Sequence, residues 1–367
     1  MKIIISGGGT GGHIFPAIAI ANALKRKLND CEILFVGANG RMEMMLVPKA
    51  GYAIEGLTVA GFQRKISLKN IFRNLIFPFK LLISLAKAKR IIRKFKPDIA
   101  IGVGGYASGP IMRIATRKNI PTLIQEQNSY PGITNKILSH QVDKICVAYE
   151  NMDKFFPSEK VVLTGNPIRQ DIQHLEGKRD EAAKYFALDG NKKTVLVIGG
   201  SLGARAINEA MRTNLEKLQN EGWQILWQTG KNFDTTKINT SIENKLSTKI
   251  LPFIDKMDLA YSIADVIVSR AGAISISELS VVGKPCILVP SPNVAEDHQT
   301  KNAMALVSKK AAAMLTDNEI QDNLYPALMG INNNKDIQNE LSNNLKQLVI
   351  SDADDRIADV AIGLAVK

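Results

Sequence analysis

The sequence predicts an α/β protein with two parallel-sheet domains. Short apolar runs of strand length recur along the chain, and helical patterns separate most of them, which is typical of a parallel sheet covered by helices on both faces. Residues 3–28 lead from an apolar strand through a glycine loop into a helix, and the chain repeats this organisation from residue 194. The length of 367 residues is sufficient for two domains. We therefore expect two related Rossmann-like domains.

The expected strands fall into two groups that meet near residue 165. The first group lies at residues 2–6, 32–36, 53–57, 99–103, 122–126, 144–147 and 161–165. The second group lies at residues 194–198, 224–228, 249–251, 266–269, 286–289 and 312–315. Because such sheets bind ligands at the carboxyl ends of their strands, the glycine-rich and polar segments that follow the strands contain the candidate site residues.

Composition limits the kinds of protein and of partner. The net charge of +12 and the isoelectric point of about 9.4 indicate an anionic partner, such as nucleic acid, a membrane surface or a phosphorylated substrate. The three cysteines are far apart and lack metal-ligand spacing, so we expect reduced core residues of a cytoplasmic protein. No uncharged apolar stretch reaches the ~18 residues of a membrane span, and the first apolar run is too short for a signal peptide.

The first glycine loop, residues 7–13, directly follows the first expected strand. Glycine permits tight turns and close approach of a ligand, and the helix start that follows offers N–H groups and a partial positive charge that suit a phosphate. Gly7, Gly9 and Gly12 fit the G-x-G-x-x-G pattern, but Glu32 lies at the wrong end of the second strand for a NAD-binding domain. A tight turn without a ligand is the alternative. Pro16 is expected in the first helical turn.

Two further strand-to-helix turns lie in the second half of the chain. Residues 199–203 form a second glycine loop, and residues 269–278 form another turn. Ser275 and Glu278 have the spacing of a capping box, whereas a glutamate on the first turn of such a helix could also accept hydrogen bonds from both ribose hydroxyls of a nucleotide. Residues 296–302 gather several hydrogen-bonding side chains. We expect these segments to surround one cleft together with the loops of the first half.

Residues 64–96 differ in character from the rest of the chain. Basic residues recur every seven positions, at Arg73, Lys80, Lys87 and Lys94, and apolar residues form a second stripe. Pro78 interrupts the helical pattern and is expected to break the helix. The segment is either a core-packing helix with a solvated basic face or a surface that lies on anionic lipid, with cations at the headgroups and aromatic side chains at the acyl boundary.

Six motifs in one order extend along nearly the whole chain. They are Gly8-Gly9-Thr10-Gly11-Gly12-His13, Gly104-Gly105-Tyr106-x-Ser108-Gly109-Pro110, Glu126-Gln127-Asn128, Gly165-Asn166-Pro167-x-Arg169, Gly199-Gly200-Ser201-x-Gly203-Ala204-Arg205 and Ser269-Arg270-x-Gly272-Ala273-x-Ser275-x-x-Glu278. In this order they are similar to the MurG family of glycosyltransferases. The resemblance implies a GT-B fold and transfer of N-acetylglucosamine from its UDP conjugate to the 4-hydroxyl of the N-acetylmuramoyl group of lipid I. It also implies inversion, the product lipid II, and no cofactor or metal ion.

The resemblance further implies a domain division and a set of site residues. Residues 1–164 with 350–367 would form the acceptor- and membrane-side domain, and residues 165–349 the UDP-sugar-binding domain. The implied donor contacts are Thr10, Gly11, Gly12, Asn128, Arg169, Ser201, Ile254, Ala273, Ile274, Ser275, Glu278 and Gln299. The implied acceptor side consists of Gly104, Gly105, Tyr106 and Ser108.

This resemblance places Thr10, Gly11 and Gly12 on the donor side of the first glycine loop and assigns the other donor residues to parts of the nucleotide sugar. The diphosphate is assigned to Arg169, Ser201 and residues 273–275, the ribose to Glu278 and the uracil to the backbone of Ile254. Asn128 and Gln299 would contact the sugar, and His298 is the alternative to Gln299 by one position.

Inversion requires a base that removes the proton of the attacking acceptor hydroxyl. His13 ends the first glycine loop, and the reference pKa of histidine, about 6.5, suits this role near neutral pH. Glu126 is the alternative base, because it ends a strand of the same domain. His13 could instead only cap the loop or contact a phosphate.

Two other functions stay open at this point. The first is another UDP-sugar enzyme of the same fold, either a glycolipid glycosyltransferase or a UDP-N-acetylglucosamine 2-epimerase. The Tyr106 loop and residues 64–96 favour a lipid-linked acceptor over an epimerase. A nucleic-acid-binding protein is the second, but aromatic residues make up only 6% of the chain. We expect a peripheral protein on the cytoplasmic face of the plasma membrane that contacts anionic lipid through residues 64–96 and binds no nucleic acid.

Overall fold

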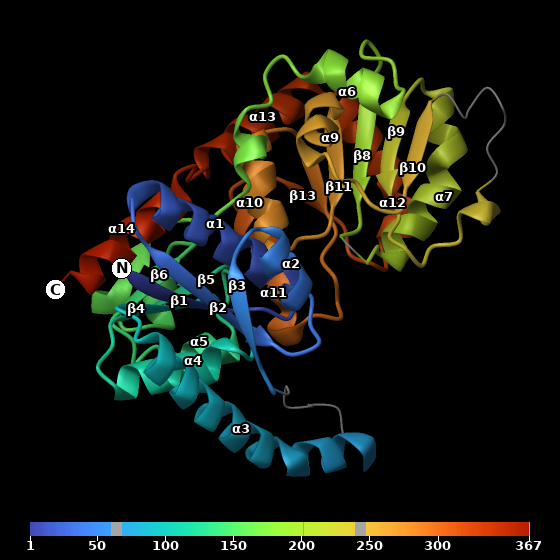
Figure 1. The fold of residues 1–367 in the computed structure, drawn as a ribbon. Coiled ribbons are helices and arrows are strands. Elements are labelled where there is room, and N and C mark those ends of the chain that lie inside the picture. The colour runs from blue at the N-terminus through green and yellow to red at the C-terminus, as the bar shows by residue number, and fades with distance from the viewer. Residues whose placement is uncertain (60–67, 201, 239–246, 367) are drawn as a thin grey trace. The chain divides into compact units, whose positions relative to one another are not determined.

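The computed structural model describes residues 1–59, 68–200, 202–238 and 247–366, which form two compact units (Figure 1). The first unit consists of Met1–Ile168 and Ile350–Lys367, and the second of Arg169–Val349. Each unit contains one sheet whose neighbouring strands are all parallel, with helices on both faces. The predicted α/β class with two parallel-sheet domains is therefore confirmed.

The sheet of the first unit has seven strands in the order β3-β2-β1-β4-β5-β6-β7. Their bounds are β1 Lys2–Ser6, β2 Glu32–Ala38, β3 Ala53–Leu57, β4 Ile99–Gly102, β5 Thr122–Glu126, β6 Lys144–Val147 and β7 Val161–Leu163. Ile3 and Ile5 enter one core cluster and Ile4 enters the other, so β1 is buried on both faces and reads as a continuous apolar run. The strand order reverses between β1 and β4, which is where ligands bind in such sheets.

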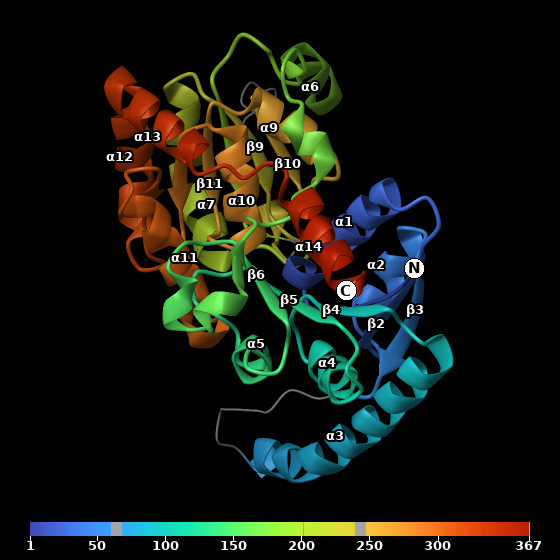
Figure 2. The same cartoon turned by 90° about the vertical axis from the view of Figure 1, so that its left-hand side faces the viewer.

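The helices of the first unit form two layers (Figure 2). One face of the sheet is covered by α1 Gly11–Lys27, α2 Glu43–Lys49 and α14 Ala353–Ala365. The other face is covered by α3 Leu68–Phe95, α4 Ser108–Arg117 and α5 Ile133–Leu138, and η1 Met152–Lys154 and η2 Ser158–Lys160 precede β7. The C-terminal helix α14 packs against α1, where Arg26 pairs with Asp354 at 2.8 Å. The last residues of the chain therefore complete the first unit.

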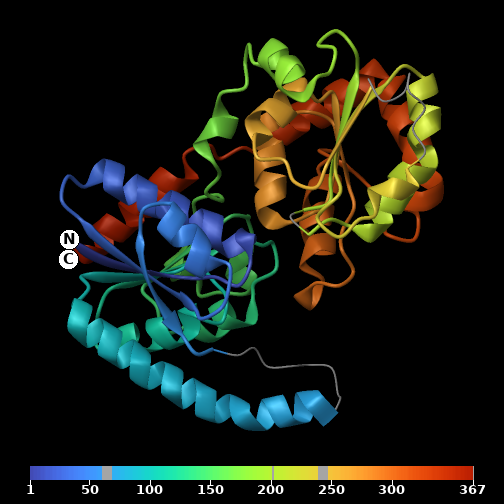
Figure 3. The ribbon, with the colours of Figure 1, turned by 45° about the vertical axis from the view of Figure 1, so that its right-hand side comes forward.

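The sheet of the second unit has six strands in the order β10-β9-β8-β11-β12-β13. Figure 3 shows helices on both faces of this sheet. Their bounds are β8 Thr194–Ile198, β9 Gln224–Gln228, β10 Thr248–Leu251, β11 Val266–Ser269, β12 Cys286–Leu288 and β13 Ala313–Met314. One face is covered by α7 Arg205–Asn220 and α12 Ile320–Asn332, and the other by α6 Arg179–Phe186, α9 Met257–Ile263, α10 Ala273–Val282 and α11 His298–Val307. Helix α13 Lys335–Gln347 contributes to both cores, and the short helices are η3 Gln170–Gln173, η4 Thr235–Lys237 and η5 Ala295–Asp297.

Every expected strand is present, and the differences are confined to strand ends; β7, for example, ends at Leu163. Three predictions about helices are wrong. Pro16 lies in the second turn of α1, where it cannot donate the helical hydrogen bond to the carbonyl of Gly12. Pro78 lies inside α3 and does not end it, since a proline can weaken or bend a helix that continues on both sides.

The third wrong prediction is the capping box. The N-cap residue of α10 is Gly272, so Ser275 is already helical and cannot cap. Glu278 consequently lies in the second turn of α10, not the first, and its carboxylate contacts Arg169 and Tyr261.

Candidate functional site

The first glycine loop lies at the carboxyl end of β1, between β2 and β4. Gly8 has a φ of 151° and Gly9 a φ of 90°, a region that other residues rarely adopt. Thr10 is the extended N-cap residue of α1, and Gly11 and Gly12 form the first helical positions. Thr10 and Gly12 are exposed, and no acidic side chain lies in this first turn. The loop therefore presents backbone N–H groups at a helix start, as predicted.

His13 lies in the first turn of α1 and points back toward the loop. Its Nδ1 atom is 3.1 Å from the carbonyl oxygen of Gly8 and 3.4 Å from the Thr10 hydroxyl. A carbonyl oxygen can only accept a hydrogen bond, so Nδ1 carries the proton in this contact and Nε2 carries the lone pair of the neutral ring. A Cβ atom added to Gly104 would lie 2.8 Å from Nε2, so the ring packs against the loop after β4.

The loop after β4 contains Gly104 and Gly105, with φ values of 91° and 81°. A Cβ atom added to Gly105 would lie 2.4 Å from the carbonyl oxygen of Gly8, so the two glycine loops of this unit are in contact. Tyr106 is 56% exposed, whereas Ser108 is fully buried and donates its hydroxyl to the carbonyl of Gly105 at 2.9 Å. Of this group, Tyr106 is available to a ligand, and Ser108 fixes the turn.

Glu126 ends β5 and is almost completely buried. Its Oε1 atom accepts hydrogen bonds from the backbone and side-chain nitrogens of Asn128, both at 3.0 Å. Its Oε2 atom accepts from the N–H of Gly132 at 3.0 Å and from Asn135 Nδ2 at 2.9 Å. Both oxygens are therefore engaged in shaping the loop after β5, and this geometry favours His13 over Glu126 as a base that reaches a substrate.

Arg169, Tyr261 and Glu278 form a polar group in the second unit. Arg169 Nε donates to Glu278 Oε1 at 3.2 Å, and the Tyr261 hydroxyl donates to Glu278 Oε2 at 3.0 Å. Burial raises the pKa of Glu278, although the charge of Arg169 opposes this shift. Burial alone would lower the pKa of Arg169, but the negative charge of Glu278 raises it overall. The group can thus hold one carboxylate in a fixed orientation.

The start of α10 lies next to this group. Ala273, Ile274 and Ser275 are its first three residues, all half-buried, and no side chain caps the helix. The backbone N–H groups of these residues have no helical acceptor, because the first four N–H groups of any helix lack one. Such a helix start suits a phosphate.

Ile254 follows β10 and is buried, with its N–H donating to Gln228 Oε1 at 3.0 Å. Gln228 also donates from Nε2 to the carbonyl of Gly200 in the second glycine loop, at 2.9 Å. Ser201 lies outside the described residues. In α11, Gln299 Oε1 accepts the N–H of Ser291 at 2.8 Å, so Gln299 fixes the loop after β12.

The sequence of this chain matches two family descriptions over most of its length. The glycosyltransferase family 28 N-terminal domain matches residues 3–147, and the glycosyltransferase family 28 C-terminal domain matches residues 194–357. A protein of Flavobacterium psychrophilum named UDP-N-acetylglucosamine--N-acetylmuramyl-(pentapeptide) pyrophosphoryl-undecaprenol N-acetylglucosamine transferase is 54% identical over 364 residues, covering 99% of this chain and 97% of that protein. A protein of the same name from Cytophaga hutchinsonii is 55% identical and covers 98% and 95%.

The chain belongs to the MurG family of glycosyltransferases. It is also similar to the crystal structure of MurG from Acinetobacter baumannii, with 30% identity, a TM-score of 0.75 and 99% of each chain covered. The predicted GT-B architecture and the predicted N-acetylglucosaminyltransferase activity are thereby confirmed.

The described part of this MurG-family chain lacks two kinds of feature. Among these residues, no group of three or more histidine, cysteine, aspartate or glutamate side chains is arranged to hold a metal ion. Within the same residues, no helix has the length and apolar character that crossing a membrane requires.

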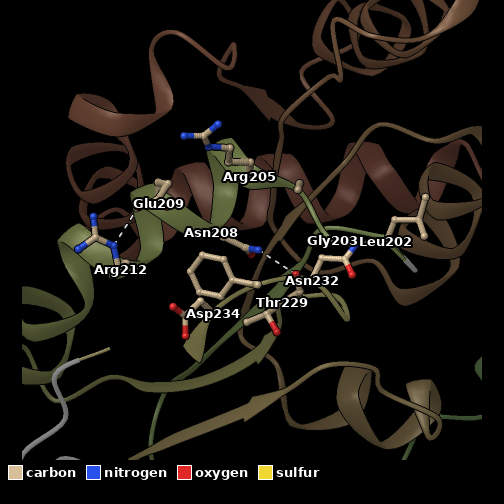
Figure 4. Close-up of a pocket in the computed structure, with 11 residues that line it drawn as sticks. Leu202, Gly203, Arg205, Asn208, Glu209, Arg212, Thr229, Asn232 and Asp234 are labelled. Atoms are coloured by element: carbon tan, nitrogen blue, oxygen red, sulfur yellow. Dashed lines mark hydrogen bonds and ion pairs between the residues drawn. The ribbon is translucent and has the colours of Figure 1, made fainter. Parts of the chain in front are cut away.

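A cavity of about 560 Å³ lies in the second unit, between the start of α7 and the segment after β9 (Figure 4). On its wall Asn208 Nδ2 donates to the carbonyl of Thr229 at 2.8 Å, and Arg212 pairs with Glu209 at 2.9 Å. Among the residues that the structure describes, none of the predicted site residues lines this cavity. Gly203, Ala204 and Arg205 of the fifth motif do line the cavity, so it lies beside the second glycine loop.

Helix α3 of this MurG-family chain exposes an apolar surface. Phe79, Leu81, Leu82 and Ile83, here named the α3 patch, are exposed by 68%, 39%, 64% and 57%. Further along, Ala88, Ile91 and Ile92 are buried in the core of the first unit. Part of α3 thus packs as a core helix, and part exposes apolar side chains that no described residue covers.

The basic stripe of α3 is less uniform than the sequence suggests. Lys94 is exposed, but Lys87 Nζ donates to the carbonyl of Gly56 at 2.6 Å. Lys87 therefore fixes the helix to the end of β3, and Lys94 is directed to solvent.

Sequence reasoning missed two side chains that hold the glycine loops. Glu43 accepts the N–H of Gly9 at 3.0 Å, and Gln228 binds Gly200 as described. The available signal is polarity in an apolar context: Glu43 lies among methionines, and Gln228 ends a buried strand.

Proposed function

We propose that this protein transfers N-acetylglucosamine from UDP-N-acetylglucosamine to the 4-hydroxyl of the N-acetylmuramoyl group of lipid I, giving lipid II with inversion. The observation that carries this proposal is the 54–55% identity, over nearly the full length, to transferases whose names state this donor and acceptor. Retention of the site motifs supports it, because each motif lies at a strand end or helix start that can contact a ligand.

In the second unit, we propose that α10 and its neighbours bind the UDP moiety. The start of α10, residues 273–275, carries a partial positive charge that suits the diphosphate. The guanidinium of Arg169, beside Glu278, supplies a second positive group. Glu278 would accept hydrogen bonds from the ribose hydroxyls, for which Tyr261 and Arg169 hold its carboxylate. The Ile254 backbone would border the uracil, Gln299 would contact the sugar, and Ser201 would contact the diphosphate.

In the first unit, we propose that His13 is the general base. The hydrogen bond from Nδ1 to Gly8 leaves the lone pair on Nε2, the atom that would remove the proton of the acceptor hydroxyl. Tyr106, Gly104 and Gly105 would contact the acceptor. Thr10, Gly11, Gly12 and Asn128 would face the transferred sugar. Glu126 would act only by shaping the loop that carries Asn128.

We further propose that the protein binds the cytoplasmic face of the plasma membrane through α3. The acceptor carries an undecaprenyl chain that stays in the bilayer, so the enzyme must reach it there. The α3 patch supplies apolar side chains, and exposed Lys94 supplies positive charge for anionic headgroups. Residues 64–67 of the expected surface lie outside the described residues.

The test is transfer of radiolabelled N-acetylglucosamine onto a lipid I analogue, with and without EDTA. We expect labelled lipid II in both samples. An epimerase would change the donor without an acceptor, and its product would contradict the proposal. Flotation with anionic vesicles tests the membrane proposal separately. Binding of an oligonucleotide without vesicle binding would instead favour the nucleic-acid alternative.

A further inference from the structure

We propose that Glu43 is a positioning residue that fixes the tautomer and orientation of His13 through a single peptide group. Glu43 is the first residue of α2 and is 1% exposed. Its Oε2 atom accepts the N–H of Gly9 at 3.0 Å, and its Oε1 atom accepts the N–H of Ala38 at 2.9 Å. One buried carboxylate thus joins the first glycine loop to the end of β2.

The contact continues through the peptide group between Gly8 and Gly9. The N–H of this group belongs to Gly9 and contacts Glu43, and its carbonyl belongs to Gly8 and contacts His13 Nδ1 at 3.1 Å. In a planar trans peptide, the N–H and the C=O point in opposite directions. Glu43 and His13 therefore bind opposite ends of one rigid group, and holding the N–H fixes the direction of the carbonyl.

Three glycines make this arrangement possible. A Cβ atom added to Gly8 would lie 2.2 Å from Glu43 Oε1, and one added to Gly37 would lie 2.5 Å from Glu43 Cγ. One added to Gly105 would lie 2.4 Å from the carbonyl oxygen of Gly8. At these three positions the backbone lies directly against the Glu43 side chain or the peptide group, because no side chain could fit between them. This close packing limits their movement.

The chemical consequence concerns the proton on His13. A fixed carbonyl opposite Nδ1 favours the neutral tautomer with its lone pair on Nε2, and it also accepts from the imidazolium formed after proton uptake. In hydrolytic triads a carboxylate performs this task by direct contact. Here a carboxylate acts through an intervening amide, whose polarisation by Glu43 strengthens the carbonyl as an acceptor.

This inference rests on the proposed function for the catalytic role of His13, but its structural part can be tested without activity. The test variant is Glu43→Gln, which preserves size but replaces one accepting oxygen by an NH₂ group that would face an N–H donor. The matched control is Asp143→Asn at the opposite end of the sheet. Asp143 accepts the N–H and the hydroxyl of Thr122, both at 2.8 Å, and lies in the same unit.

Three quantities are measured on wild type and both variants: the long-range ¹H–¹⁵N spectrum of the His13 ring, UDP affinity by calorimetry, and kcat with a soluble lipid I analogue. The ring signals are assigned by their loss in His13→Ala. For E43Q we expect a mixture of His13 tautomers, unchanged UDP affinity and a kcat lowered by about 10²-fold, the loss that displacing a catalytic group by ~1 Å can cause. For D143N we expect the wild-type tautomer and kcat.

An unchanged His13 spectrum in folded E43Q would overturn the proposal, as would an equal loss of kcat in D143N. If E43Q does not fold, Glu43→Asp takes its place: its shorter carboxylate cannot reach both N–H groups, and the same spectral change is expected. If wild type transfers no sugar, the proposed function fails, whereas the ring spectra still decide whether Glu43 sets the tautomer.

Discussion

The first and second glycine loops occupy equivalent places in their sheets but are held in different ways. Each follows a central strand, β1 or β8, and leads into a helix, α1 or α7. Glu43 holds the first loop by accepting the N–H of Gly9. Gln228 holds the second by donating to the carbonyl of Gly200, and it also accepts the N–H of Ile254.

This difference indicates different chemical tasks. A carboxylate can only accept, so Glu43 fixes an N–H and turns the carbonyl of the same peptide toward His13, which can exchange a proton. An amide both donates and accepts, so Gln228 can join two backbone segments by itself. This arrangement involves no titratable side chain. We infer that the first loop serves proton transfer and the second frames the nucleotide.

Replacing His13 tests the first half of this comparison and has the largest expected effect. His13→Ala should lower kcat on a soluble acceptor by about 10²–10⁴-fold, the usual contribution of a general base. UDP affinity, measured by calorimetry, should stay the same, because the proposed UDP contacts lie in the second unit. A near-normal kcat would remove His13 from the chemistry and make Glu126→Gln the next variant to measure.

Replacing Glu278 tests the second half. Glu278→Ala removes the proposed acceptor of the ribose hydroxyls, and a charge-assisted hydrogen bond contributes about 2 kcal/mol, or roughly 30-fold in the Kd of UDP. Tyr261→Phe is the companion variant, because it keeps the carboxylate and removes only the hydrogen bond at 3.0 Å. Unchanged calorimetric binding by Glu278→Ala would refute the ribose assignment.

The same residue predicts a pH dependence. Burial raises the pKa of Glu278 above its ordinary value of 4.5. The ionised carboxylate accepts at both oxygens and the protonated acid does not, so UDP should bind more weakly as the pH falls toward this raised pKa. Glu278→Gln should bind weakly at every pH and lose this dependence. A wild-type Kd whose pH dependence equals that of Glu278→Gln would contradict the prediction.

Gln228→Met should have a smaller effect, and it tests whether the second glycine loop serves UDP binding and not catalysis. It removes the hydrogen bonds to Gly200 and Ile254, each about 1 kcal/mol. Because these bonds lie within the protein, only part of their free energy should be lost from UDP binding, which should weaken by about tenfold with little change of kcat at saturating donor. The control is Gln224→Met at the other end of β9, where Gln224 binds the backbone of Asp189. It should lower stability but preserve UDP affinity. A large loss of kcat in Gln228→Met would show that both loops serve catalysis.

The smallest expected effect concerns α3. Lys94→Gln should weaken flotation with anionic vesicles by about fivefold, since a basic residue near such a surface contributes ~1 kcal/mol. Lys87→Gln is the matched control from the same stripe, and it should change vesicle binding less because Lys87 Nζ contacts the carbonyl of Gly56. Equal effects of the two variants would show that the carbonyl contact does not withdraw Lys87 from the surface. Activity on a soluble acceptor should be unchanged in both.

The sequence alone was sufficient to predict the strands, both sheets and the glycine loops. These features are local: an apolar run such as Ile3–Ile5 followed by glycines and a helical pattern identifies a strand, a turn and a helix start without knowledge of the rest of the chain. The motif order also predicted the family, because it combines many such local signals. Local signals failed where two interpretations had the same spacing, as with Ser275 and Glu278, whose capping-box pattern lies inside α10.

Only the tertiary structure determined which side chains hold the site together. Glu43 lies 34 positions from Gly9, and Glu278 lies 109 positions from Arg169, so no spacing rule connects them. Burial requires such partners, because a carboxylate removed from water needs hydrogen bonds from N–H groups or contacts with cations. The packing of α2 and α10 determines which of these groups lie within reach. The local sequence thus determines which chemical groups each loop offers. The orientation of these groups depends on residues that only folding brings near.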